Sequence, residues 1–264
     1  MTTVTEPGGH SSTIRLTAIP GIPEVRKGDR ISTLLLDGLE KAGIKLIDRD
    51  IIAITHKVIS KAEGRLVNLD DVTPGSRARE IAVITDKDPK LVQMILTEST
   101  GISRMRNGVL IVRHRLGFTS ANAGIDRSNV PQNGAGEWVI LLPINPDSSA
   151  AQIGGDILDR CGVNVGILIV DSHGRPFRLG TVGVAIGVSG IPALWDRRGE
   201  SDLYGYHLEH TEVGTADEIA AAASILMGQA SEGQPAILIR GLNLPPLQGK
   251  ARDLVRSKEL DLYR

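Results

Sequence analysis

Apolar side chains recur at helical spacing along residues 29–42, so that they fall on one face of a predicted helix. Gly43 follows this pattern and suits a helix stop, because glycine readily adopts the left-handed conformation that ends many helices. Similar patterns predict three further helical segments. They cover residues 77–100 with a break around residues 86–89, residues 147–161, and residues 215–227.

The expected ends of the last two helices carry their own signals. For the first of them, Asp147 or Ser148 is the expected N-cap, and Gly162 lies just beyond the end. Cys161 closes that helix and is expected to be a small core residue. The second opens with the sequence TADE at residues 215–218, which has the spacing of a capping box. It contains four consecutive alanines, which allow close packing, and Gly228 is its expected C-cap.

Runs rich in isoleucine and valine, or with alternating apolar and polar residues, predict strands. These runs cover residues 13–19, 50–60, 109–114, 138–142, 165–170 and 235–240. Helices and strands are mixed without strict alternation, which favours an α+β fold with mixed sheets and packed helices. Residues 13–264 are expected to form one domain. Residues 1–12 are polar and are expected to be a disordered tail.

Composition excludes several classes of function. Lysine and arginine number 30 against 31 aspartate and glutamate, and aromatic residues make up only 3%. The chain therefore has neither the basic excess nor the stacking residues typical of nucleic-acid binding. A single cysteine excludes an internal disulfide. No apolar run approaches the roughly 18 residues that span a membrane, and residues 1–12 lack a signal-peptide core, so we expect a cytoplasmic protein.

Two polar segments stand out as candidates for chemistry. Residues 122–129 are rich in turn formers and include Asp126, while Asp171 and Ser172 follow directly after the predicted buried strand 165–170. Acidic residues at the exit of a buried strand commonly face a ligand-binding crevice. Asp126 and Asp171 are therefore candidate ligands of a hard cation such as Mg²⁺ or Mn²⁺. The alternative is that Asp126 makes an Asx-turn and Asp171 caps the next turn.

Several motifs, taken in order, resemble the coenzyme F420-0:γ-glutamyl ligase family. The resemblance runs from about residue 14 to about residue 241 and rests on five main segments. They are IPE at residues 22–24, THKVISKAEGR at 55–65, NAGID with SNV at 122–130, DSHGR at 171–175, and MGQ at 227–229. It implies a fold of two intimately associated lobes and an intertwined homodimer. Actinobacterial relatives with an added nitroreductase-like domain are also similar, and that second domain is not expected here.

The resemblance implies a ligase that adds L-glutamate to coenzyme F420-0 and then extends the tail by γ-linkage. GTP is the implied co-substrate, an acyl phosphate the implied intermediate, and Mg²⁺ or Mn²⁺ the implied metal, two per site, with K⁺ as a further candidate. Asp126 and Asp171 would hold one metal and act in catalysis, and Ser172 with Gln229 would hold the second. The implied GTP-binding residues are Ile22, Pro23, Glu24, Val25, His56, Lys61, Asn129, Met227, Gly228, Gln229, Ala230, Ser231, Glu232, Gly233 and Gln234.

Each of these residues also has a simpler interpretation from the sequence. Lys61 could be a solvated lysine, Asn129 a turn former and Gln229 an ordinary loop residue. His56 departs from the serine of some relatives, and His173 is a candidate base or metal ligand with no assigned role. Cations for the substrate phosphodiester and for glutamate could be Arg113, His114, Arg115, Arg175 and Arg178, although exposed arginines usually pair with surface acids.

Two other functions compete with this interpretation. One is a metal- and nucleotide-dependent acid–amine ligase with a different acceptor, and the other is a nucleotide-binding protein that has lost catalysis. The glycine-spaced stretch at residues 180–190 is neither a P-loop nor a dinucleotide fingerprint. Because it is apolar, it is expected to be covered by a partner subunit. The alternative is that this stretch packs inside one subunit, since small apolar residues are often buried.

Overall fold

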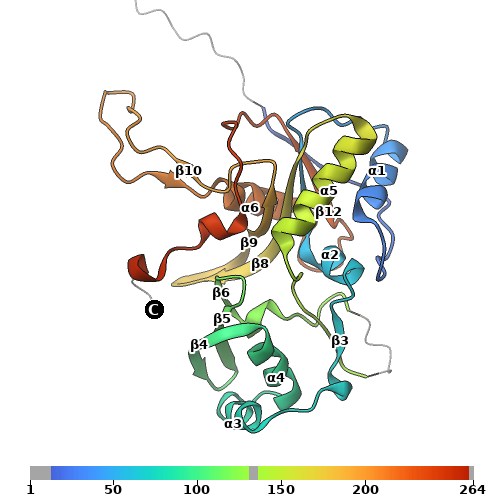
Figure 1. The fold of residues 1–264 in the computed structure, drawn as a ribbon, viewed down its shortest axis with the longest axis vertical. Helices are drawn as coiled ribbons and strands as arrows, with labels where there is room; N and C mark the ends of the chain where they lie inside the picture. Colours follow the sequence, from blue (N-terminus) through green and yellow to red (C-terminus); the bar gives the residue numbers. More distant parts are fainter. Residues whose placement is uncertain (1–12, 131–135, 262–264) are drawn as a thin grey trace, which may run out of the picture.

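A five-stranded mixed sheet forms the centre of the computed structural model, which describes residues 13–130 and 136–261 (Figure 1). Its strand order is β1-β12-β2-β8-β9, and all neighbours are antiparallel except the parallel pair β2 and β8. The strands are Arg15–Ala18 (β1), Ile51–Thr55 (β2), Gly166–Arg175 (β8), Arg178–Ser189 (β9) and Ala236–Arg240 (β12). The strands expected near residues 13–19, 165–170 and 235–240 are thus confirmed.

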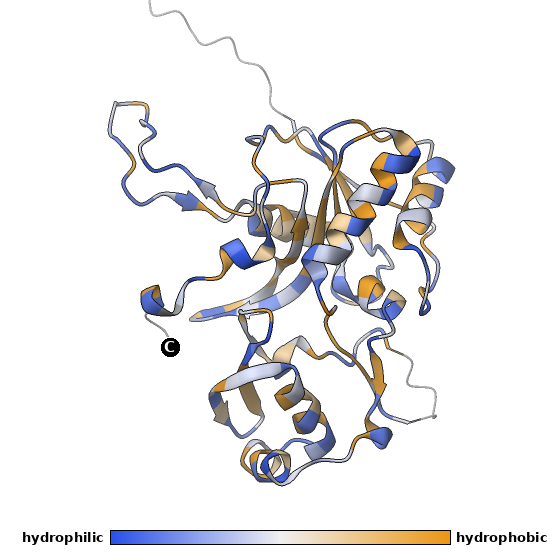
Figure 2. Cartoon of the chain, in the orientation of Figure 1, coloured by the Kyte–Doolittle hydropathy of each residue, from blue (hydrophilic) through white to orange (hydrophobic). Residues whose placement is uncertain are grey.

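Helices cover both faces of this sheet because its strands are apolar on both sides. Ile52 and Ile54 of β2 pack with α1 and α5 on one face, and Ile51 and Ala53 pack with α6 on the other. Figure 2 shows mainly apolar residues where the strands of this sheet lie between the helices. These helices are Ile31–Lys41 (α1), Pro146–Cys161 (α5) and Thr215–Met227 (α6), which confirms three of the four predicted helical segments.

Two glycines in β9 let the flanking helices approach the sheet closely. A Cβ atom at Gly183 would lie 2.5 Å from the carbonyl oxygen of Ala220 in α6, and one at Gly187 would lie 2.6 Å from the carbonyl oxygen of Pro146 in α5. The apolar residues between them, Val184, Ala185 and Ile186, and the following Val188 pack inside the subunit. The part of the glycine-spaced stretch from Gly183 to Val188 is therefore covered mainly by its own chain, which is the alternative to a partner subunit. Gly180 and Thr181 are exposed, and cover by a partner stays a prediction for them.

A second region packs a three-stranded antiparallel sheet against two short helices (Figure 1). Its elements are Ser76–Thr85 (α3), Pro89–Thr97 (α4), Ser99–Arg106 (β4), Val109–His114 (β5) and Thr119–Ala121 (β6). The predicted break between the helices is confirmed, since Asp86 is left-handed and Asp88 caps α4 by accepting from the backbone N–H of Lys90. The predicted helical end at residue 100 is wrong, because β4 begins at Ser99.

Short elements complete the fold. Strand Leu66–Asn68 (β3) pairs with Trp138–Ile140 (β7), which is shorter than the expected strand 138–142, and Trp195–Asp196 (β10) pairs with Glu212–Val213 (β11). The 3₁₀ helices are Leu69–Asp71 (η1), Asn122–Gly124 (η2), Ala251–Leu254 (η3) and Lys258–Leu260 (η4). The mixed sheets with packed helices confirm the α+β class. The tail predicted at residues 1–12 lies outside the described residues.

The predicted strand over residues 50–60 is wrong in its second half. Strand β2 ends at Thr55, and His56–Ala62 form helix α2. His56, Ile59 and Ser60 are buried on one side of this helix, at the i, i+3 and i+4 positions. Burial of that face overrides the strand preference of Val58 and Ile59.

Three expected details at helix ends also differ. Asn145, not Asp147 or Ser148, caps α5, and its Oδ1 accepts from the backbone N–H of Ser148. The capping box at α6 does not form, because Gly214 occupies the N-cap. Cys161 does end α5, but it is exposed. Gly162 and Gly228 end their helices with positive φ angles, as predicted.

No helix within residues 13–130 and 136–261 has both the length and the apolar character needed to cross a membrane.

Candidate functional site

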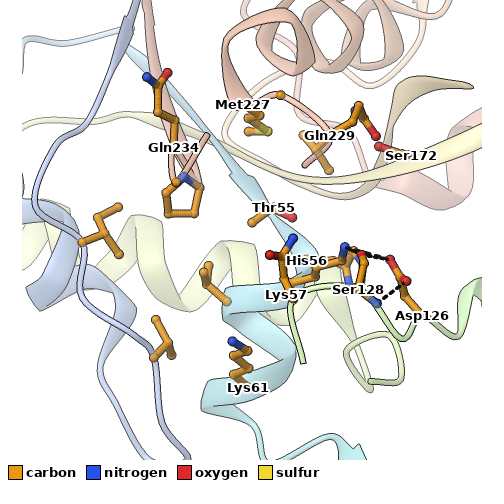
Figure 3. Close-up of a pocket in the computed structure, with 18 of the residues that line it drawn as sticks. Thr55, His56, Lys57, Lys61, Asp126, Ser128, Ser172, Met227, Gln229 and Gln234 are labelled. Atoms are coloured by element: carbon orange, nitrogen blue, oxygen red, sulfur yellow. Dashed lines mark hydrogen bonds and ion pairs between the residues drawn. The ribbon is translucent and has the colours of Figure 1, made fainter. Parts of the chain in front are cut away.

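A cavity of about 520 Å³ lies where β2 ends at Thr55, beside Val170, the last residue of β8 that pairs with β2 (Figure 3). Because these two strands are parallel, the residues beyond this point emerge at the same edge of their pairing. Strand β8 itself continues to Arg175, so Asp171 lies within the strand and not at its exit as predicted. Strand β2 leads into Thr55, His56 and Lys57, while β8 supplies Asp171 and Ser172. Three further segments complete the lining. They are residues 22–25, residues 126–129, and the loop 227–235 after α6.

Nearly every residue implied as nucleotide- or metal-binding lines this cavity. The lining includes Ile22, Pro23, Glu24, Val25, His56, Lys61, Asp126, Asn129, Asp171, Ser172, Met227, Gly228, Gln229, Ala230, Ser231, Gly233 and Gln234. Glu232 is not part of the lining. Its carboxylate accepts from the backbone N–H of Ala230 at 2.8 Å and thereby shapes the loop.

Asp126 is held by an ion pair that the sequence analysis missed. The Nζ atom of Lys57 lies 2.7 Å from Oδ2 of Asp126, and it also donates to the hydroxyl of Ser128 (Figure 3). Ser128 donates its backbone N–H to Oδ1 of Asp126 at 2.8 Å, which is the expected Asx-turn. Burial alone would raise the pKa of Asp126, but Lys57 and Ser128 outweigh it and lower this pKa. The carboxylate is thus kept ionised at the cavity wall.

Asp171 is a more buried carboxylate, with its side chain 12% exposed, and two histidines contact it. Nε2 of His173 lies 2.8 Å from Oδ2, and Nε2 of His56 lies 3.3 Å from Oδ1. The backbone N–H of Ser172 also donates to Oδ1 at 2.7 Å. Burial acts to raise the pKa of Asp171, whereas His56 and His173 lower it more strongly. For His56, burial is the stronger effect. It lowers the pKa of His56 more than the negative charge of Asp171 raises it.

The donor set fits a hard divalent cation only in part. Asp126 and Asp171 offer ionised oxygens, and Ser172 and Gln229 add neutral oxygens to the same cavity. Among residues 13–130 and 136–261, no group of three or more histidine, cysteine, aspartate or glutamate side chains is arranged to hold a metal ion. Two carboxylates with few other protein ligands suit Mg²⁺, which usually completes its shell with water and substrate phosphates.

The loop after α6 closes the opposite wall of the cavity. Gly228 has a φ of 71°, and a Cβ atom there would meet the carboxylate of Glu232. Asn129 also has a positive φ, of 55°, and its Nδ2 donates to the carbonyl oxygen of Ala230 at 3.3 Å. Asn129 is therefore both the expected turn former and a link between two cavity walls.

A second and larger cavity, of about 1580 Å³, lies next to the first. His173 connects the two, because its ring lines the second cavity while its Nε2 contacts Asp171 in the wall of the first. Several arginines from separate segments line the second cavity. They are Arg104, Arg113, Arg115, Arg252 and Arg256.

Two of the candidate substrate cations in this second cavity have structural partners. Arg115 lies 3.0 Å from the buried carboxylate of Glu98 and donates to the carbonyl oxygens of Pro143 and Ile144. His114 is also buried beside Glu98 and stacks on Phe118. Glu98 is thus the anion that holds Arg115, just after β5, against the segment before α5.

The remaining candidate cations differ in position. Arg113 lines the second cavity and forms no ion pair with a described acid. Arg175 and Arg178 line neither cavity, and Arg175 donates to the carbonyl oxygen of Leu179 across the β8–β9 turn.

Comparison with known proteins agrees with the motifs. Residues 21–241 match the F420-0:Gamma-glutamyl ligase family. The chain is 46% identical to the coenzyme F420:L-glutamate ligase of Methanothermobacter thermautotrophicus, over 95% of this chain and 99% of the relative. It is 44% identical to the protein of the same name from Methanopyrus kandleri, over 97% and 100% of the two chains, and 48% identical to that of Methanocaldococcus jannaschii, over 82% and 85%. The chain therefore belongs to the F420-0:gamma-glutamyl ligase family of enzymes.

Proposed function

We propose that this enzyme uses GTP to join L-glutamate to the carboxylate of coenzyme F420-0, and then extends the tail by γ-linkage. The observation that carries the proposal is the contact of His173 with Asp171, which puts the arginine-lined cavity directly beside the cavity lined by the motifs that resemble the ligase family. The names of the relatives supply the acceptor and the amino acid.

GTP is assigned to the smaller cavity. Lys57 and Lys61 lie one helical turn apart on α2, so both can direct their ammonium groups to phosphate oxygens. The loop 227–235 adds backbone groups, which can bind phosphate without a P-loop. Apolar side chains of Ile22, Val25 and Met227 supply contacts for a base or ribose.

Divalent cations are assigned to the same cavity. Asp126 and Asp171 would hold one, and Ser172 and Gln229 the second, with K⁺ as a further candidate. Bound Mg²⁺ or Mn²⁺ supplies charge neutralisation for phosphoryl transfer. Lys57 supplies part of the same neutralisation from the chain itself, because its ammonium already lies against Asp126.

The acceptor is assigned to the larger cavity, where Arg113 can bind its phosphodiester. The carboxylate of the acceptor attacks the γ-phosphorus of GTP and releases GDP, forming an acyl phosphate. The amine of glutamate then attacks the acyl carbon, forming the amide and releasing inorganic phosphate and a proton. In both of these steps the protein mainly positions the reacting groups and stabilises negative charge.

We also propose a homodimer, on different grounds from the sequence-based ones. Leu179 at the β8–β9 turn and Leu203 in the extension between β10 and β11 are each 98% exposed. Both extensions project from the body of the subunit (Figure 1), and exposed apolar tips of this kind suit contact with a second copy. Light scattering should give a dimer for the wild type and a shift to monomer for Leu179→Asp. A wild-type monomer at micromolar concentration would contradict this.

The central test combines product analysis with isotope tracing. Purified protein with F420-0, GTP and glutamate should yield glutamylated products by mass spectrometry, together with GDP. When the acceptor carboxylate carries ¹⁸O, the label should appear in inorganic phosphate by ³¹P NMR. Label in GMP with release of pyrophosphate would reject the acyl phosphate. Activity with another acid in place of F420-0, and none with F420-0, would favour an acid–amine ligase of different specificity.

A further inference from the structure

Asp217 is a carboxylate in the second cavity that the assignments above do not use. It lies in the first turn of α6, and its Oδ1 accepts from the backbone N–H of Ala185 in β9 at 2.8 Å. No ion pair joins Asp217 to a lysine, arginine or histidine of the described residues. The side chain is only partly exposed, so this carboxylate is half-buried without an ion-pair partner.

The charge around Asp217 defines the kind of ligand that would fit there. Arg113, Arg252 and Arg256 line the same cavity, and none of the three is paired with a described acid. These guanidinium groups attract anionic groups, whereas Asp217 attracts a cation. A molecule that carries both carboxylates and an ammonium group, as an amino acid does, matches both features at once.

Asp217 is also close to the proposed reaction centre. Its partner Ala185 pairs with Val170 across the sheet, and Val170 immediately precedes Asp171. His173 lines the same cavity as Asp217 and contacts Asp171 on the other side. Burial raises the pKa of Asp217 more than the backbone N–H of Ala185 and the charge of His173 lower it, and an ammonium ion bound there would offset the cost of this burial.

We propose that the Asp217 carboxylate binds the ammonium group of the incoming amino acid beside the acyl carbon of the activated acceptor. This group loses one proton to solvent, and the resulting amine attacks the acyl carbon. The inference rests on the proposed ligase function and adds a substrate-binding residue to it. Arg252 and Arg256, which the phosphodiester does not use, then bind the carboxylates of the amino acid. The position of the ammonium group fixes which end of the amino acid faces the activated acceptor.

A matched pair of variants tests this role. Asp217→Asn keeps an oxygen for the N–H of Ala185 but removes the charge. Asp147→Asn is the control, because Asp147 also lies in the first turn of a helix, lines the same cavity, and accepts from two backbone N–H groups, those of Val188 and Ala251. Asp217→Asn should raise the KM for glutamate about tenfold or more, as loss of a buried charge partner does, and Asp147→Asn should leave this KM near the wild-type value.

Hydroxylamine separates the binding of the amine from the activation of the acceptor. It is a neutral nucleophile near pH 8 and needs no carboxylate to hold it, so its reaction with the acyl phosphate should give equal amounts of hydroxamate in Asp217→Asn and wild type. An unchanged KM for glutamate, or an equal fall in hydroxamate and in glutamylated product, would overturn the role of Asp217. If wild type makes glutamylated product but no hydroxamate, the acyl phosphate is wrong, and the KM comparison still decides Asp217.

Discussion

The ammonium group of Lys57 lies 2.7 Å from the carboxylate of Asp126, so that α2 is tied to the segment after η2 across the mouth of the smaller cavity. Lys57 is 20% exposed and also donates to Ser128. This ion pair places an ammonium group and a carboxylate side by side in the wall of the smaller cavity, where phosphate and metal are proposed to bind.

Lys57→Ala should raise the KM for GTP by roughly tenfold to a hundredfold, since a hydrogen bond to a charged group is worth about 1.5–3 kcal/mol. Lys61→Ala should also raise the KM for GTP. Neither variant should change the KM for glutamate to a similar extent, because the two lysines line the smaller cavity and not the second one. Steady-state kinetics with each substrate varied separately measures this. A larger effect on glutamate would move the lysine concerned to the acceptor side.

Asp126→Asn and Asp171→Asn should each lower kcat by about 100-fold or more, as loss of preorganised charge stabilisation does. Asparagine keeps an oxygen for the backbone N–H of Ser128 or Ser172, so thermal unfolding should stay close to wild type. Rates are to be measured at saturating Mn²⁺ and GTP. Near-wild-type rates for both variants under those conditions would rule out the metal assignment.

Glu98 should make the stability of the protein depend on acid pH. Its burial alone would raise its pKa, but His114 and the guanidinium groups of Arg65 and Arg115 lower this pKa from 4.5 to about 2. A folded-state pKa below the unfolded one stabilises the fold above the unfolded value. This contribution, about 3 kcal/mol at 1.36 kcal/mol per pKa unit, is lost as the pH falls from about 4.5 toward 2.

Chemical denaturation at a series of pH values checks the effect of Glu98. Glu98→Gln should be less stable than wild type at pH 7, because it leaves buried cations without their anion. The difference between the two proteins should shrink as the pH falls below 4.5. A constant difference across this range would show that Glu98 acts through packing and not through its charge.

Gly183→Ala should destabilise the fold, because its Cβ would lie 2.5 Å from the backbone oxygen of Ala220. Overpacking of this kind costs about 1–3 kcal/mol. Gly174→Ala, in the neighbouring strand β8, is the control, since a Cβ there meets nothing within 4 Å. Thermal unfolding should show a clear drop for the first variant only. Equal effects would mean that the close approach of α6 to β9 is not what requires glycine.

The sequence determined those features that depend on local periodicity and on motifs. Helices α1, α5 and α6, strands β1 and β12 and the first part of β8 follow from repeating apolar positions, whereas β9 was not predicted. These predictions of helices and strands succeed because spacing along the chain sets which side chains share a helix face or a sheet face. The motifs also implied Asp126 and Asp171 as site residues; both line the smaller cavity, and their roles stay predictions.

Only the tertiary structure decided what pairs with what. Residues 56–60 are helical because burial of one face outweighs their strand preference, and Glu98 gained its purpose from Arg65 and Arg115, which lie 33 and 17 positions away in the chain. Lys57 and Asp217 carry no local signal, since their partners Asp126 and Ala185 come from other elements. Long-range pairing depends on how the sheet is assembled, and no local pattern of residues encodes it.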